Sequence, residues 1–168
     1  MILLFWDASS LAKRYTEELG YEVVDTLFSL GESTKMASTP WGYVETYSIV
    51  LRRFNSKRIS QFSFEASVTA LQEEVLLNLD FMLFTVSDED IFLSTAMMRK
   101  HNLNSTDAAI LTIILGIRNT SEAPEIVVVA ADKRLLRAAE AEGLKTLNPE
   151  EMPLAELPSF IASLESTL

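Results

Sequence analysis

The amino-acid sequence predicts an α/β domain with a central parallel sheet. Short apolar runs alternate along the chain with amphipathic stretches, and capping or turn residues separate the two kinds of segment. The apolar runs lack an alternating polar face, which is typical of strands buried on both sides of a sheet. The chain has 168 residues, of which 48% are hydrophobic, so one domain with a substantial core is expected.

The first predicted element is a strand that runs straight into an acidic residue. The apolar run from Ile2 to Trp6 predicts a buried strand, and Asp7 follows it directly. Ser9 or Ser10 is expected to cap the helix that comes next, over about 9–17. Ligands of open α/β sheets bind at the carboxyl edge, and a carboxylate buried there needs a partner such as a cation.

The rest of the chain continues the alternation. Expected helices span about 23–30, 41–54 after the Thr39-Pro40 start signal, 62–79, 87–100 with a capping box of Ser87 and Asp90, a buried apolar stretch after Asp107, and 132–143. Expected strands span about 35–38, 82–86, 126–130 and 144–147. Residues 1–150 are interpreted as the domain, and 151–168 as an acidic appendage that packs on it and carries one weak helix.

Composition excludes several kinds of site. The absence of cysteine rules out disulfides and thiolate metal sites, and the single histidine, His101, is interpreted as a solvated residue near a helix end. The net charge of −10 argues against non-specific binding to nucleic acid, yet four cations lie together between Arg52 and Arg58. We find no targeting signal and no apolar stretch long enough to span a bilayer, so a soluble, cytoplasmic protein is expected.

Four acids stand at similar places in the predicted elements: Asp7, Glu45, Asp107 and Asp132. Each alone could be a turn residue, a surface residue or an acid favoured by a helix dipole. Together, three of them would gather near one edge of the sheet, and they would need cations there. Oxygen ligands without His or Cys select Mg²⁺ or Mn²⁺, which points to hydrolysis of a phosphodiester or a phosphate monoester.

Other nucleotide and phosphate chemistries lack their motifs. The chain has no phosphate-binding P-loop, no dinucleotide-binding glycine fingerprint after the first strand, and no nucleophile elbow. A haloacid-dehalogenase-type phosphatase would need a second Asp at position 9, where this chain has Ser9.

Four stretches resemble, in order, the motifs of the PIN domain family and of its VapC-like toxin ribonucleases. FWDASSLAKRY resembles a strand that ends in Asp-x-Ser, and WGYVE resembles the second motif with its helical Glu. HNLNSTDAAIL resembles the third motif, and VVVAADKRLLRAAEAEGLKTLNPE resembles the fourth. The resemblance implies a three-layer α/β/α PIN-like fold with a parallel sheet in the order 3-2-1-4-5. It also implies a Mg²⁺- or Mn²⁺-dependent endoribonuclease, usually a homodimer, that a cognate antitoxin inhibits.

By position, the resemblance implies that Asp7, Glu45 and Asp107 are the main metal ligands and that Asp132 is the fourth acid. It also implies that the Ser9 hydroxyl hydrogen-bonds within the site. One departure is Ala130, where the family usually has Ser or Thr.

We expect a metal-activated water to attack the phosphorus and leave 5′-phosphate and 3′-hydroxyl ends, with Glu45 or Asp132 accepting the proton. Candidate contacts to RNA phosphates are Lys13, Arg14, Arg52 and Arg53. Two alternatives stay open: a catalytically weak or inactive module that binds RNA or a protein partner, and a metal-dependent phosphatase of small substrates.

Overall fold

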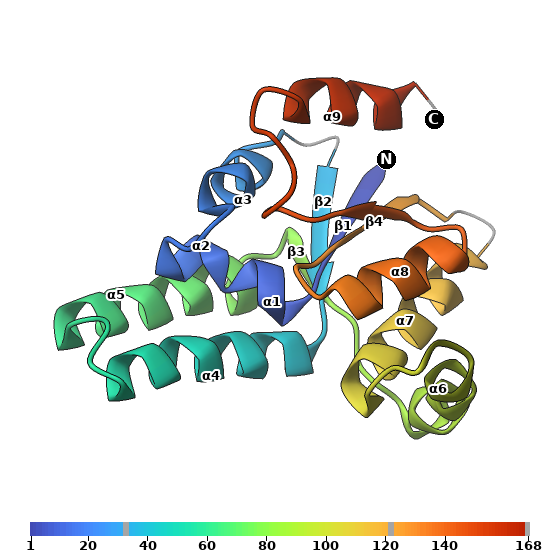
Figure 1. Ribbon diagram of the computed structural model, residues 1–168, viewed down its shortest axis with the longest axis horizontal. Helices are drawn as coiled ribbons and strands as arrows, with labels where there is room; N and C mark the ends of the chain where they lie inside the picture. The colour runs from blue at the N-terminus through green and yellow to red at the C-terminus, as the bar shows by residue number, and fades with distance from the viewer. Residues whose placement is uncertain (32–33, 121–122, 167–168) are drawn as a thin grey trace.

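A five-stranded parallel sheet forms the centre of the protein. The computed structural model describes residues 1–31, 34–120 and 123–166 (Figure 1). The strands are β1 (Ile2–Trp6), β2 (Thr34–Ser38), β3 (Phe81–Leu83), β4 (Glu125–Val129) and β5 (Lys145–Leu147). They lie in the order β3-β2-β1-β4-β5, and all neighbouring pairs are parallel, which confirms the predicted topology.

Helices cover both faces of the sheet. The described helices are α1 (Ala8–Leu11), α2 (Lys13–Thr16), α3 (Tyr21–Phe28), α4 (Pro40–Asn55), α5 (Gln61–Leu71), the π-helical turn η1 (Gln72–Leu76), α6 (Asp88–His101), α7 (Ser105–Arg118), α8 (Lys133–Ala141) and α9 (Leu157–Glu165). No described helix is long and apolar enough to cross a membrane.

The central strand β1 divides the hydrophobic core into two halves. Its side chains alternate, so Ile2, Leu4 and Trp6 pack on one face with residues of α3 and α9. Leu3 and Phe5 pack on the other face with residues of α7 and α8. Every residue of β1 is buried, as its continuous apolar run predicts. This arrangement fixes the direction in which the chain leaves β1 at Asp7.

Several predicted elements differ from the structure in their bounds. The helix expected over 9–17 is two short helices, and it ends at Glu17, whose φ of 46° is left-handed. The helix expected over 62–79 is α5 followed by the turn η1, and Leu79, expected on its apolar face, is 99% exposed. The strand expected over 82–86 is shorter and spans Phe81–Leu83. The capping box of Ser87 and Asp90 is confirmed.

The C-terminal segment contributes to the core. Leu157 and Leu164 of α9 are 1% and 0% exposed and belong to the half of the core that contains Trp6. Figure 1 shows α9 at the end of the molecule where β1 and β2 begin. The last two residues of the predicted appendage, 167 and 168, lie outside the described part of the chain.

Candidate active site

The four predicted acids line one pocket at the carboxyl edge of the sheet. The pocket has a volume of about 230 Å³ and is lined by Asp7, Ala8, Ser9, Glu45, Ser48, Ile49, Arg52, Asp107 and Asp132. The acids come from four elements that are distant in sequence: the end of β1, helix α4, the first turn of α7 and the start of α8. That they bind metal or act in catalysis stays a prediction.

Asp7 is held by the strand that precedes it and by the helix that follows it. Its backbone N–H donates to the Val129 carbonyl at 3.0 Å and so extends the ladder between β1 and β4. Its Oδ2 accepts from the Ser9 N–H at 2.9 Å, which makes Asp7 itself the N-cap of α1. The expectation that Ser9 or Ser10 caps this helix is therefore wrong. Asp7 is 6% exposed, so its carboxylate is nearly removed from water.

The two serines after Asp7 tie the ends of β1 and β4 together. The Ser9 hydroxyl donates to Asp7 Oδ2 at 2.5 Å and accepts from the backbone N–H groups of Ala131 and Asp132, at 2.9 and 3.3 Å. The Ser10 hydroxyl lies 2.5 Å from the Val129 carbonyl and 2.9 Å from that of Asp7. This bonding fixes the segment that carries Asp132 relative to Asp7.

Glu45 reaches the pocket from α4, together with the residues four and seven positions later. The helix begins at Thr39, whose side chain accepts from the Gly42 N–H at 3.1 Å, and Pro40 occupies its first turn. Glu45, Ile49 and Arg52 all line the pocket, as their helical spacing predicts. A Cβ at Gly42 would lie 2.2 Å from Ser38 Oγ, so only glycine allows the start of α4 to approach β2 this closely.

Asp107 and Asp132 are both fixed by helix N-termini. Asn104 is the N-cap of α7, and its side-chain amide also donates to Asp107 Oδ2 at 2.8 Å. Asp132 is the N-cap of α8, and its Oδ1 accepts from the backbone N–H groups of Arg134 and Leu135, at 2.7 and 3.3 Å. The role of Asn104 was not predicted, although an Asn three residues before an acid at a helix start is a capping signal.

Burial and, to a smaller extent, neighbouring charges raise the pKa values of three of the four acids. Burial is the main cause of the raised pKa of Asp107, and the charges of Asp7, Asp132 and Glu45 raise it further, to about 7. Burial also raises the pKa of Asp7, although hydrogen bonds from Ser9 oppose this. The pKa of Glu45 is raised by burial and by Asp7, and is lowered by Arg52. The pocket therefore carries more negative charge than its own cation balances.

The donor set of this pocket suits a hard divalent cation. Four carboxylates without a Cys or His are the ligands that Mg²⁺ or Mn²⁺ prefers, and Arg52 is the one cation among the residues that line the pocket. Among the described residues, however, no three His, Cys, Asp or Glu side chains are already arranged to hold one ion.

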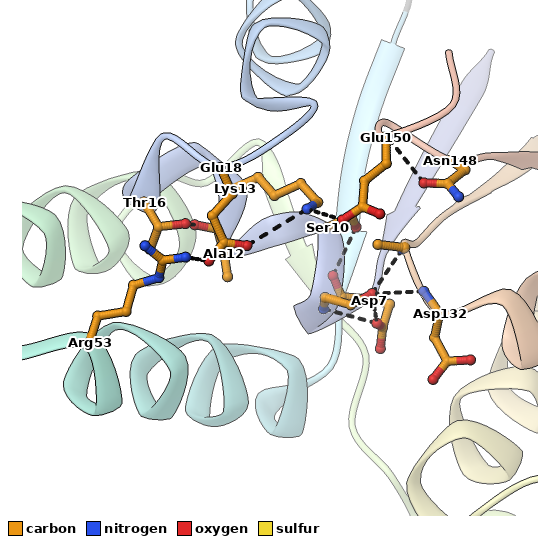
Figure 2. A network of polar contacts seen from close by, with 12 residues as sticks. Asp7, Ser10, Ala12, Lys13, Thr16, Glu18, Arg53, Asp132, Asn148 and Glu150 are labelled. Atoms are coloured by element: carbon orange, nitrogen blue, oxygen red, sulfur yellow. Dashed lines mark hydrogen bonds and ion pairs between the residues drawn. The ribbon is translucent and has the colours of Figure 1, made fainter. Parts of the chain in front are cut away.

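Three of the four predicted phosphate contacts form ion pairs with acids of the protein itself, and their contact with RNA stays a prediction. The Lys13 side chain is 2% exposed, and its Nζ lies 2.6 Å from Glu150 Oε1 and 3.8 Å from Glu18 Oε2 (Figure 2). Arg53 pairs with the same Glu18. Arg14 pairs with Asp25 and Glu74, at 2.8 Å in both cases. Of the four cations, only Arg52 lines the pocket.

The structure corrects the expectation for His101 and places the departure at Ala130. His101 is not a solvated residue, because its side chain is 10% exposed and its Nε2 lies 2.5 Å from Glu142 Oε1. Ala130 does not border the pocket: it is fully buried and belongs to the half of the core that contains Phe5. A hydroxyl at position 130 would therefore lie in the core and not at the pocket, where the hydroxyl comes from Ser9.

The fold and the pocket define an α/β protein with an acidic site at the carboxyl edge of a parallel sheet. A family model described as PIN domain matches residues 23–150, and the chain belongs to this family. No curated protein matches the sequence.

Solved structures share the fold at low sequence identity. A toxin–antitoxin complex from Klebsiella pneumoniae has 13% identity and a TM-score of 0.53, and the match covers 89% of this chain and 99% of the other. VapBC-1 from nontypeable Haemophilus influenzae has 14% identity and a TM-score of 0.54, with 90% and 100% covered. A protein from Pyrobaculum aerophilum has 12% identity and a TM-score of 0.50, with 98% and 96% covered. These similarities concern the fold.

Proposed function

We propose that this protein is an endoribonuclease that depends on Mg²⁺ or Mn²⁺ and hydrolyses RNA phosphodiester bonds. The observation that carries the proposal is the convergence of four carboxylates from four separate elements on one pocket of a PIN domain. Asp7, Glu45, Asp107 and Asp132 are the residues that would hold the cation. The ion would supply an activated water and neutralise charge on the phosphoryl oxygens.

The chain's own residues divide the remaining tasks. Ser9 fixes Asp7 and the backbone beside Asp132 through its three hydrogen bonds. Asp132 Oδ1 is already engaged by two backbone N–H groups, whereas no described residue hydrogen-bonds to the Glu45 carboxylate. Since burial and Asp7 also raise the pKa of Glu45, we assign Glu45 rather than Asp132 as the acceptor of the proton from water.

A cleavage assay tests this proposal. Wild-type protein with millimolar Mg²⁺ should cut structured RNA, and Asp7→Asn should reduce the rate at least 100-fold. Asp88→Asn is the matched control, because Asp88 is an exposed acid in the first turn of another helix. The products should carry 5′-phosphate and 3′-hydroxyl ends. Products with 2′,3′-cyclic phosphate, or equal cleavage by the Asp7→Asn protein, would refute the proposed chemistry.

The alternative function is a PIN module that binds RNA or a protein without cleaving. It is favoured by the finding that no three acids among the described residues are arranged around one point. RNA binding without metal-dependent cleavage would support it. Release of phosphate from a small monoester, without RNA cleavage, would indicate the phosphatase instead.

A protein partner is the second part of the proposal. An apolar cavity of about 520 Å³ lies between α4, α6 and α7, and it shares Glu45 and Ser48 with the acidic pocket. Beside it, Trp41 and Val44 are 57% and 53% exposed, and apolar surface of this kind marks protein interfaces. Because structures of similar fold come from toxin–antitoxin complexes, we propose an antitoxin that covers this surface and blocks the acids.

Self-association is proposed as well. The first turns of α6 expose Ile91, Phe92 and Leu93, of which Phe92 is 73% exposed. Light scattering should give the mass of a homodimer, and Phe92→Asp should shift it towards the monomer. A monomer at micromolar concentration would contradict this part of the proposal.

The division of the chain also stays a proposal. We propose that residues 1–150 form the nuclease domain and that the following segment is an appendage packed on it. The burial of Leu157 and Leu164 in the core supports the packing.

A further inference from the structure

The acidic pocket itself offers little positive charge to hold a polyanion. Arg52 is the one cation among the residues that line the pocket, where it faces four carboxylates. Lys13, Arg14 and Arg53 are taken up in internal ion pairs. The phosphates on either side of a cleaved bond therefore need other cations.

A second, polar pocket supplies such cations. It has a volume of about 300 Å³ and is lined by His101, Asn102, Arg134, Arg137 and Ala138. The two segments that build it also carry the acids of the first pocket. The backbone N–H of Arg134 donates to Asp132 Oδ1 at 2.7 Å, and Asn104, two residues after Asn102, donates to Asp107 Oδ2.

The two arginines of this pocket are available to a ligand. Both are exposed, and no described carboxylate pairs with either guanidinium. The Nε of Arg137 donates to the Lys133 carbonyl at 3.1 Å, which leaves its terminal nitrogens for other acceptors. The neighbouring basic residues, in contrast, already have carboxylate partners: Lys133 pairs with Glu151, and Lys100 and His101 pair with Glu142.

The geometry of the helix presents these charges together. Arg134 and Arg137 are three residues apart on α8, so they lie on one face of the helix. A guanidinium can bind a phosphate through two parallel N–H bonds, and two adjacent guanidinium groups match the repeated charge of a nucleic-acid backbone. His101 lines the pocket but has its Nε2 engaged by Glu142, so the arginines carry the binding.

We propose that Arg134 and Arg137 bind the phosphodiester backbone of the RNA substrate next to the acidic pocket. The inference rests on the proposed ribonuclease function, since it names the contacts that hold the substrate at that site. The inferred phosphate contacts are thus two residues of α8, in place of Lys13, Arg14 and Arg53.

Binding can be measured separately from cleavage. Full-length protein with Asp7→Asn is mixed with a fluorescent single-stranded RNA in millimolar Mg²⁺, and fluorescence anisotropy gives the affinity over a range of KCl concentrations. Each contact to single-stranded RNA adds about 0.7 to the slope of log K against log salt, so Arg134→Gln and Arg137→Gln should each lower the slope by about 0.7. We expect each change to weaken binding about tenfold at low salt.

Lys133→Gln is the matched control, because it removes the same charge from the same helix at a residue that already has a partner. It should leave both affinity and slope unchanged. Arg134→Lys should restore the slope, since it restores the charge, but only part of the affinity, because it cannot bind in a bidentate manner. Circular dichroism confirms that each variant is folded.

The outcomes separate this inference from the proposed function. Arginine-dependent RNA binding, together with a wild-type protein that does not cleave RNA in Mg²⁺, would support the inference and refute the cleavage activity. Cleavage by the wild type, with an unchanged salt slope in the double variant Arg134→Gln/Arg137→Gln, would overturn the inference alone. It would also be overturned if the double variant lost binding to a polyglutamate peptide but not to RNA, since the pocket would then take an acidic peptide.

Discussion

Removing one charge from the acidic pocket should stabilise the metal-free protein. The change is Asp107→Asn, which keeps an oxygen that can accept from Asn104 but removes the charge that Asp7, Glu45 and Asp132 repel. The pKa of Asp107 is about 7 in the folded protein, against the ordinary value of 3.8. Wild type therefore loses stability as the pH rises from about 4 to 7, because only the folded state still binds this proton.

The size of the gain follows from this shift. At 1.36 kcal/mol per pKa unit, the difference would correspond to about 4 kcal/mol in a site without solvent. Because the pocket opens to water, screening reduces this to about 2 kcal/mol. Asp107 also lies in the first turn of α7, so the substitution loses about 0.3–1 kcal/mol of interaction with the helix dipole. We expect a net gain of about 1 kcal/mol above pH 7.5, and almost none near pH 4.

Urea unfolding in EDTA at pH 4.5 and pH 8 measures this gain, with equal m-values as the check on two-state behaviour. Asp88→Asn is the control: it loses only a dipole interaction, so it should be slightly destabilising at pH 8. If Asp107→Asn were no more stable than wild type at pH 8, while Asp88→Asn behaved as expected, burial and the other acids would not destabilise the ionised Asp107 carboxylate as described.

Three further predictions concern the same region. Millimolar Mg²⁺ should raise the Tm of wild type but not that of Asp7→Asn. At a Mg²⁺ concentration of 100 times the Kd, the stabilisation should be about 2.7 kcal/mol. An equal rise of Tm in both proteins would argue against binding at this pocket. Ser9→Ala should lower the free energy of unfolding by about 1–3 kcal/mol in chemical denaturation, because the Ala131 N–H loses its acceptor, whereas Ser29→Ala on the surface should change it little. Glu150→Gln should destabilise the protein by about 2–3 kcal/mol and Lys13→Met by about 1 kcal/mol, because only the first change leaves a buried ammonium poorly paired. Thermal melts in which Lys13→Met has the lower Tm of the two variants would contradict this account of the ion pair.

The positions of the strands and of the acids could be predicted because both follow from local patterns. The apolar run of β1 ends at Asp7, and the spacing of Glu45, Ile49 and Arg52 places all three on one face of α4. Strand alternation alone predicts a parallel sheet but does not order its strands. That order came from the resemblance to the PIN family, and the structure confirms it.

The ion pairs could not be predicted, because their partners are distant in sequence. Lys13 bonds to Glu150, which is 137 residues away, and His101 bonds to Glu142, which is 41 residues away. In sequence, Lys13 and Arg14 differ little from the exposed Arg134, so their availability depends on which acids the fold brings close. The turn η1 was also missed, since the apolar pattern of Val75 and Leu79 continues the helical spacing of α5.

The hydroxyl of Ser9 has no bonding capacity to spare. A serine side chain has one donor and two acceptor positions, and here the donor faces Asp7 while both acceptors face backbone N–H groups. The three bonds hold the Ser9 side chain between Asp7 and the backbone of Ala131 and Asp132, so a rotation of this hydroxyl would break at least one of them. Both bonds from Ser9 fall on Oδ2 of Asp7, so one residue sets the orientation of this carboxylate through its hydroxyl and its backbone N–H together.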